Sequence, residues 1–152
     1  MMETEMTREQ LGVLVWSLFL RTHAAVVPRI EQDLLRRRQL PLAWYDVLLE
    51  LNAAAGRRLR MQELGNRVVL SRSRASRVVD ELAAAGLVRR DPDPSDRRGS
   101  FAVLTDSGRQ RLRAAAPVYL TGIGEHFTAA LTDEELPVLQ AALGRVLAGN
   151  DD

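Results

Sequence analysis

Cysteine and lysine are both absent from the sequence, which has 152 residues. Without cysteine there are no disulfides, no thiolate metal ligands and no sensing mechanism that oxidises a thiol. Because lysine is missing, all 21 basic residues are arginine. The planar guanidinium suits bidentate contacts to phosphate and guanine, although codon bias across a genome explains an arginine-only chain more simply than a requirement at each site.

Long hydrophobic runs are absent as well. No stretch approaches the roughly 18 consecutive apolar residues of a membrane span, and the N-terminal segment MMETEMTREQ is polar and acidic, unlike a signal peptide. We therefore expect a cytoplasmic protein with no membrane partner. With 46% hydrophobic residues, the chain is long enough for one compact domain that buries roughly 70% of its unfolded surface.

The usual constellations of an enzyme are also missing. The sequence has no Gly-rich phosphate loop, no metal-ligand cluster and no serine beside a plausible histidine base. Its two histidines, His23 and His126, could meet in space, so the sequence does not forbid catalysis, but nothing in it proposes catalysis. They are too few for a zinc site and are interpreted as ordinary polar positions. No enzymatic activity, cofactor or metal is expected.

The charge is unevenly distributed. The net charge is +1, yet residues 57–98 contain 11 basic and 6 acidic residues, an excess of five positive charges. The rest of the chain has 10 basic and 14 acidic residues. A basic block inside a nearly neutral chain is the pattern expected of a phosphate-binding surface.

Helical periodicity is clearest at the two ends of the chain. From Thr7 to about Arg38 the apolar residues recur at steps of three, four and seven, although Pro28 interrupts the pattern and favours a kink. A second helix follows Pro41 and is expected to end near Gly56, a plausible C-terminal cap.

Two more helices are predicted after the basic block. One runs from about Thr105 to Leu131, with its middle weakened by Gly122 and Gly124. The last begins at Thr132-Asp133-Glu134-Glu135, which reads as a capping box, and continues through Leu147. The apolar stripes of the first and last helices need a partner, so we expect a two-fold symmetric dimer in which these helices interdigitate. The alternative is that they pack within one chain.

The middle of the chain predicts a helix-turn-helix. Ser71 stands at an N-cap position and Gly86 ends the helix after about Ala85. One helix face, Ala75, Val78, Val79 and Leu82, is expected to pack against Leu64 and Leu87. The other face carries Ser73, Ser76, Arg77 and Asp80, flanked by Arg72 and Arg74. This face is predicted to enter the major groove of DNA, with Arg77 on guanine and the serines on phosphates or base edges. An ordinary amphipathic helix with a solvated arginine face is the alternative.

A β-hairpin is predicted next. Leu87–Arg90 and Ser100–Leu104 read as paired strands around a loop over residues 91–99 that is rich in proline and aspartate. Arg97 and Arg98 are expected at its tip, where they can reach the minor groove, and Asp96 is expected to hold one of them in position. A solvated hairpin without a partner is the competing interpretation.

The order of these elements and several local motifs resemble the MarR family, the multiple antibiotic resistance regulators. The motifs are Glu63-Leu64-Gly65, Leu70-Ser71-Arg72-Ser73, Ser76-Arg77-Val78-Val79-Asp80-Glu81-Leu82, Gly86-Leu87-Val88, Asp96-Arg97-Arg98-Gly99 and Leu104-Thr105-Asp106-Ser107-Gly108. The resemblance implies a mainly α fold with a small β-hairpin: a winged helix-turn-helix core flanked by N- and C-terminal dimerisation helices. It also implies an obligate homodimer on a pseudo-palindromic operator, with Arg98 in the minor groove and the helix opened by Ser71 in the major groove.

The resemblance further implies a single domain over residues 7–148, with 42–104 as its DNA-binding core and 7–38 and 105–148 as dimerisation helices. In this family a small, often aromatic or anionic compound usually binds between the two regions and weakens DNA binding. The candidate effector-binding residues here are Trp16, His23, Trp44, Tyr45, Asp46 and Arg77. Asp46 and Arg77 resemble a carboxylate and an arginine of urate-responsive relatives; a plain salt bridge between them is the simpler alternative.

The sequence therefore predicts a homodimeric winged-helix transcriptional regulator that binds double-stranded DNA and is most simply a ligand-responsive repressor. The remaining alternative is a winged-helix module that contacts other proteins without specific DNA binding. The clustering of arginines on both the helix and the wing favours the DNA duplex.

Overall fold

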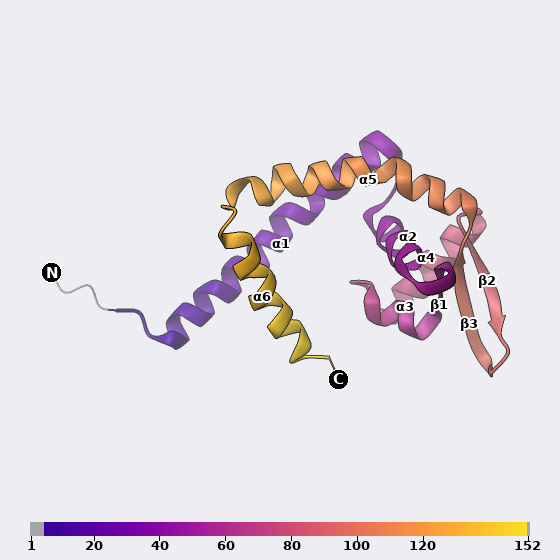
Figure 1. Ribbon diagram of the computed structural model, residues 1–152, viewed down its shortest axis with the longest axis horizontal. Coiled ribbons are helices and arrows are strands. Elements are labelled where there is room, and N and C mark those ends of the chain that lie inside the picture. Colours follow the sequence, from indigo (N-terminus) through magenta and orange to yellow (C-terminus); the bar gives the residue numbers. More distant parts are fainter. Residues whose placement is uncertain (1–4, 152) are drawn as a thin grey trace. The chain divides into compact units, whose positions relative to one another are not determined.

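The computed structural model describes residues 5–151. The first four residues of the N-terminal segment, which we interpreted as unlike a signal peptide, lie outside the described residues. Helices dominate the chain, together with one small sheet (Figure 1). The helices are α1 (Arg8–Arg38), α2 (Leu42–Ala53), α3 (Met61–Arg67), α4 (Arg72–Ala84), α5 (Asp106–His126) and α6 (Glu135–Ala148), with short 3-10 turns at η1 (Ala55–Arg57) and η2 (Thr128–Ala130). The strands are β1 (Arg58–Arg60), β2 (Val88–Asp93) and β3 (Asp96–Leu104). A mainly helical winged-helix fold is confirmed.

The predicted helix boundaries hold at most ends. α1 continues through Pro28 without a break, and α4 ends at Ala84, just before Gly86 takes a φ of +76°. Two predicted helix ends are wrong. The helix expected to reach Leu131 is α5, which stops at His126, and Phe127 has non-helical backbone angles before the separate turn η2. The end of α2 also differs. That helix stops at Ala53, where the amide of Ala54 donates to the carbonyl of Leu51, and Gly56 takes its left-handed φ of +65° inside η1 instead of capping α2.

Side-chain caps fix the starts of several helices. The hydroxyl of Ser71 accepts from the amide of Arg74 at 3.3 Å, as predicted for the N-cap of α4. The predicted capping box before α6 is also present: Thr132 accepts from the amide of Glu135 at 3.2 Å, and Glu135 accepts from the amide of Thr132 at 2.9 Å. Each such cap satisfies amides that the helix itself leaves unpaired.

The sheet has one strand more than the expected hairpin. Its order is β1-β3-β2, and all pairs are antiparallel. The hairpin strands are also longer than predicted: β2 extends to Asp93 and β3 begins at Asp96, so the loop expected over residues 91–99 is a tight turn at Pro94 and Ser95. Pro92 is tolerated because β2 lies at the edge of the sheet.

The start of α5 is locked to the end of α4. Thr105 donates its hydroxyl to the carbonyl of Gly86 at 2.8 Å and accepts from the amide of Gly108 at 3.0 Å. A side chain at position 108 would overlap the carbonyl of Leu87. Glycine is therefore required there, because the backbone of α5 approaches the α4–β2 turn directly.

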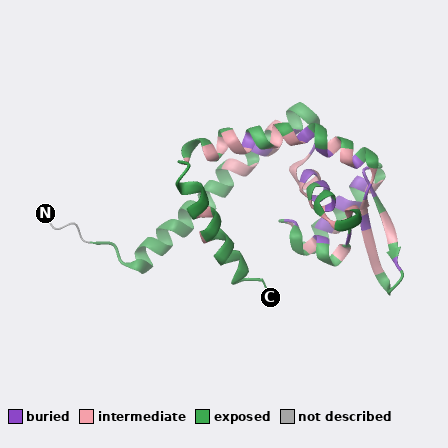
Figure 2. Ribbon diagram, viewed as in Figure 1, coloured by how far each residue is buried: buried purple, intermediate pink, exposed green. Residues whose placement is uncertain are grey.

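The chain divides into two units. One is Glu31–Leu120, and the other joins the chain up to Ile30 with the chain from Thr121 onward. Nearly all buried hydrophobic residues belong to Glu31–Leu120, and Figure 2 shows them gathered in α2, α3, α4 and the sheet. The fully buried leucines and valines are Leu34, Leu40, Val47, Leu48, Leu51, Leu64, Val79 and Leu82.

The other unit exposes many large apolar side chains. On α1 these are Leu11, Val13, Leu14, Val15, Trp16, Leu18, Phe19 and Leu20, and on α6 they are Leu136, Val138, Leu143, Val146 and Leu147. Although α1 contains no unbroken run of about 18 apolar residues, it is long and apolar enough to cross a membrane by length and composition alone. A single apolar helix near the N-terminus is weak support for such a span, since other apolar helices meet the same test.

Candidate nucleic-acid interface

Helix α4 presents one buried and one exposed face, as predicted. Ala75, Val78, Val79 and Leu82 are buried. The opposite side exposes the predicted DNA-contacting residues Arg72, Ser73, Arg74 and Arg77. The predicted contact Ser71 is also exposed, but its hydroxyl caps the helix and lies 3.4 Å from that of Ser73. The arginines of α4 are therefore its main charged groups available to a partner.

Ser76, another predicted DNA contact, is held by a residue of β2. Arg90 donates through Nη2 to the hydroxyl of Ser76 at 3.1 Å and to its carbonyl at 3.2 Å. The same nitrogen lies 2.9 Å from the carboxylate of Asp80, and Nη1 donates to the hydroxyl of Ser100 at 3.3 Å. Asp80 thus takes part in a bridge rather than lying free on a solvated face. Arg90 ties α4 to the wing, a role that sequence reasoning missed.

The residues predicted for the wing, Asp96, Arg97 and Arg98, all lie on β3. Arg97 and Arg98 are exposed, but they lie on β3 instead of at the tip. Asp96 accepts from the backbone amide of Arg98 at 3.0 Å, so it orients the chain rather than a guanidinium. A Cβ at Gly99 would lie 3.1 Å from this carboxylate, a close approach that favours glycine at that position.

Asp93 is a further wing residue that the sequence did not single out. Its side chain is only 4% exposed. It accepts from the hydroxyl of Ser95 at 2.7 Å, from the amide of Ser95 at 2.9 Å and from Nε of Arg60 at 2.9 Å. The hydrogen bond from the Ser95 hydroxyl, followed by those from Arg60 and the Ser95 amide, lowers the pKa of this carboxyl to about 2.

Helix and wing together enclose a basic hollow. It has a volume of about 500 Å³ and is lined by Arg72 of α4, Arg90 of β2, Arg98 of β3 and Arg60 of β1. Asp93 and Asp96 also line it, so four guanidinium groups face two carboxylates that are already engaged. Such an excess of positive charge in a concave surface concentrates anionic partners.

The α2 residues predicted to bind an effector have structural partners within their own unit. Trp44 donates from Nε1 to the carboxylate of Glu81 on α4 at 2.9 Å. Tyr45 is buried, with its ring centroid 4.4 Å from that of Tyr119 on α5. Burial, followed by the charges of Glu50 and Glu31, raises the pKa of Asp46 from 3.8 to about 6.

The effector candidates outside α2 are Arg77, Trp16 and His23. Asp46 and Arg77 form no ion pair with each other in the described structure, so the simple salt bridge considered from the sequence is not present. Trp16 stacks on Phe19 with centroids 6.0 Å apart, and it belongs with His23 to the other unit of the chain.

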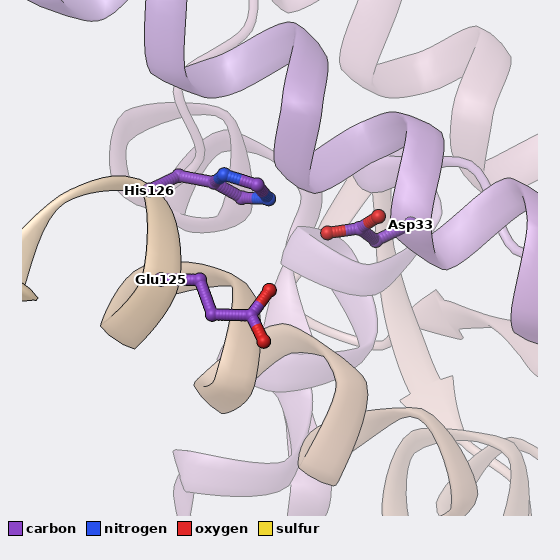
Figure 3. A group of neighbouring side chains, drawn as sticks. All are labelled: Asp33, Glu125 and His126. Atoms are coloured by element: carbon purple, nitrogen blue, oxygen red, sulfur yellow. The ribbon is translucent and has the colours of Figure 1, made fainter.

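Figure 3 draws three side chains of the described residues whose atoms could ligate a metal ion: Asp33, Glu125 and His126. Glu125 and His126 end α5, whereas Asp33 lies on α1. Asp33 belongs to Glu31–Leu120 and the other two to the second unit. No metal site is assigned to them, and the interpretation of His23 and His126 as ordinary polar positions stays a prediction.

Comparison with known proteins agrees with this geometry. The family model described as "MarR family" matches residues 38–99. The crystal structure of Sco3205, a MarR family transcriptional regulator from Streptomyces coelicolor in complex with DNA, has a TM-score of 0.83 at 34% identity and covers 95% of this chain and 89% of that one. AbsC, a MarR family transcriptional regulator from the same organism, has a TM-score of 0.81 at 32% identity, covering 95% of both chains.

A curated relative matches a shorter region. YkoM of Bacillus subtilis (strain 168), an uncharacterized HTH-type transcriptional regulator, is 32% identical over 76 residues, which is 50% of this chain. The match spans 49% of YkoM, so this chain covers about half the length of that relative.

Proposed function

Because this chain belongs to the MarR family of transcriptional regulators, we propose that it acts as a homodimeric, ligand-responsive repressor on a pseudo-palindromic operator in double-stranded DNA. The family is not enzymatic. The observation that carries the proposal is the basic hollow, in which Arg72 of the helix-turn-helix and Arg98 of the wing line one surface. A cytoplasmic location is part of the same proposal.

Each half of this surface has its own part in the proposal. The N-terminal end of α4 enters the major groove, where Arg77 contacts a base edge and Arg72 and Arg74 contact phosphates. The wing lies along the adjacent minor groove, where Arg98 meets the enhanced negative potential. Ser76 has a lesser part than Arg77, because its hydroxyl is already bonded to Arg90. The DNA-bound structure of Sco3205, similar over 95% of this chain, supports a duplex as the partner.

The dimer is supported by the exposed apolar side chains of α1 and α6. Val15 is 56% exposed and Val146 is 61% exposed, and both lie among neighbours of the same kind. Patches of this kind on a soluble protein mark surfaces that another chain covers. A second copy of the chain also supplies the second recognition helix that a pseudo-palindromic operator requires.

The effector response is assigned to α2. Asp46 lies in partly buried surroundings with a raised pKa, beside Tyr45. The adjacent Trp44 is hydrogen bonded to Glu81 of α4. A small aromatic or anionic compound bound against α2 would therefore act on the recognition helix through the Trp44–Glu81 contact.

DNase footprinting and titration on the protein's own upstream DNA test the proposal. The titration is repeated over several salt concentrations beside a random fragment of equal length. A protected inverted repeat with sequence-preferring affinity that falls steeply with salt is expected, since phosphate contacts release counterions. The absence of DNA binding even at low salt would reject the proposal and favour the protein-contact module.

Two variants separate base recognition from backbone attraction in the same titration. Arg77→Ala is expected to lose discrimination between operator and random DNA, by about 1–3 kcal/mol for one bidentate base contact. Arg98→Ala is expected to weaken operator binding and flatten its salt dependence. Arg37→Ala is the matched control and should behave as the wild type, because it removes the same charge from the last turn of α1, away from the exposed apolar residues 11–20 and from the basic hollow.

A further inference from the structure

Asp93 is exceptional among residues 5–151, because it is their only charged residue in the buried class. Both of its carboxylate oxygens are engaged. Oδ1 accepts two hydrogen bonds from Ser95, within the hairpin turn, and Oδ2 accepts one from Arg60, outside the hairpin. Arg60 ends β1 and immediately precedes α3. One side chain thus connects the wing turn to the first helix of the helix-turn-helix.

We propose that Arg60 and Asp93 form a clamp that holds the wing arginines, Arg97 and Arg98, in position relative to α3 and α4. Asp93 and Arg60 are positioning residues: they act on DNA through the wing. The inference rests on the proposed DNA-binding function and specifies how its second contact surface is held.

The sheet register shows why this pair can act across the whole wing. Arg60 pairs with Phe101 on one side of β3, and Asp91 pairs with Phe101 on the other. Asp93 lies beyond the regular part of this pairing, and the hydrogen bond from Arg60 is what links it to this part of the sheet. The guanidinium of Arg60 passes over the Phe101 ring, 5.1 Å from its centroid, to reach Asp93. The clamp therefore spans all three strands.

The clamp also fixes the place where the hairpin register changes. The pairing of β2 with β3 shifts between Pro92 and Asp93, which brings Asp93 opposite Asp96 and leaves a two-residue turn. Asp93 holds that turn through Ser95, and Asp96 holds the amide of Arg98 just beyond it. Without the clamp the turn would keep its hydrogen bonds from Ser95, but the wing would lose its tie to Arg60. Its position would then be fixed only on DNA, and the lost conformational freedom would weaken binding.

The test compares two substitutions on β2 that each remove one negative charge. Asp93→Asn can still accept from Ser95 but loses the carboxylate that binds Arg60. Asp91→Asn is the matched control, because it breaks an exposed ion pair with Arg89 at 2.8 Å and removes the same negative charge. We expect Asp93→Asn to bind operator DNA roughly tenfold more weakly than Asp91→Asn, as expected when binding must order a free hairpin.

Double variants distinguish a clamp from a loss of overall stability. In the Asp93→Asn background, Arg98→Ala should cost much less affinity than in the wild type, because an unheld wing contributes little. Arg77→Ala should cost the same in both backgrounds, since α4 is not held by the clamp. Additive effects for Arg98, or equal binding by the Asp93 and Asp91 variants, would overturn the proposal.

Approaching the clamp from Arg60 keeps the test decisive if Asp93→Asn does not fold. Arg60→Gln breaks the clamp. Its control is Arg58→Gln, which removes the same charge from the same strand. The guanidinium of Arg58 also lies over Phe101, 3.8 Å from the ring centroid. The same selective loss of the Arg98 contribution is expected only for Arg60→Gln. A wild type that binds no DNA would reject the proposed function and the clamp together, whereas a binding wild type with indistinguishable Arg60 and Arg58 variants rejects the clamp alone.

Discussion

Glu31–Leu120 and the unit formed by the two ends of the chain differ in how they bury apolar residues. Among residues 5–151, all the buried hydrophobic residues except Ile30 belong to Glu31–Leu120, whereas most exposed large apolar residues lie on α1 and α6. Sequence composition does not separate the two, because both contain regular leucine and valine spacings. One unit therefore has its core within the chain, whereas the exposed apolar faces of the other are those that we propose a second chain covers.

The largest effect is expected from a cavity in the DNA-binding unit. Leu82 on α4 is fully buried, and Leu82→Ala should lower the free energy of unfolding by about 2–5 kcal/mol. Denaturant titration at several protein concentrations measures this. The loss should be similar at each concentration if this core belongs to one chain. If the loss of unfolding free energy grows as the protein is diluted, the core of Glu31–Leu120 depends on a second chain and the two units do not differ in this way.

The next effect concerns the partner of α1. Val15→Asp introduces a charge into the exposed apolar face and should raise the dissociation constant of the dimer at least tenfold, roughly 1.4 kcal/mol or more. Val69→Asp is the control, because Val69 is 84% exposed in the turn between α3 and α4. Sedimentation equilibrium should show weakened association for the first variant only. Equal association by both would remove α1 from the dimer interface.

Replacing Asp46 should raise the free energy of unfolding, whereas replacing a core residue lowers it. Its folded-state pKa of about 6 lies above the ordinary value of 3.8, so the folded protein binds the proton more tightly than the unfolded chain. The free energy of unfolding therefore falls as the pH rises between these values. Asp46→Asn should regain about 1 kcal/mol at pH 7, after allowance for solvent screening of a partly exposed group.

Denaturant titrations at pH 4 and pH 7 check this sign, and Asp91→Asn is the control because Arg89 lowers the pKa of Asp91. Stabilisation of the Asp46 variant at pH 7 with little change at pH 4 is expected. If Asp46 binds the effector, the variant should also lose its response to ligand while its ligand-free DNA affinity stays unchanged. A full response would remove Asp46 from the effector site.

The smallest effects come from the helix caps in the two units. Ser71→Ala and Thr132→Ala should each cost about 1 kcal/mol, the usual value for a lost N-cap. Thermal unfolding followed by circular dichroism measures both. If α6 is stabilised mainly by a second chain, the Thr132 effect should depend on protein concentration while the Ser71 effect does not. If the stability losses of both variants depend on protein concentration in the same way, the two units do not differ in their need for a second chain.

Local signals predicted much of the fold. The period of Ala75, Val78 and Leu82, with a capping serine before it, located α4 and its exposed arginines. Strand β1 was missed because three residues with one buried side chain, Leu59, carry no readable alternation. Its partner strand β3 is remote in sequence, as the register of Arg58 with Val103, 45 positions apart, illustrates.

The candidate site was less predictable than the helices that carry it. Arginine clustering identified the helix and the wing, but not which polar side chains are already engaged. Ser76 and Arg90 meet only because β2 folds back beside α4, and Asp93 looked like one more turn residue. Tertiary contacts decide such assignments, because each depends on a partner that is remote in sequence.

The position of Pro92 also bears on how a hairpin can stay exposed without self-association. An open sheet edge displays unpaired amides and carbonyls to which a strand of another molecule can add. β2 is such an edge, and Pro92 removes one amide from it while Arg89 and Asp91 place charges along it. A strand added to β2 would meet charged side chains there and could not form a continuous ladder of hydrogen bonds. The wing is thereby protected from aggregation by the same strand that presents it to solvent.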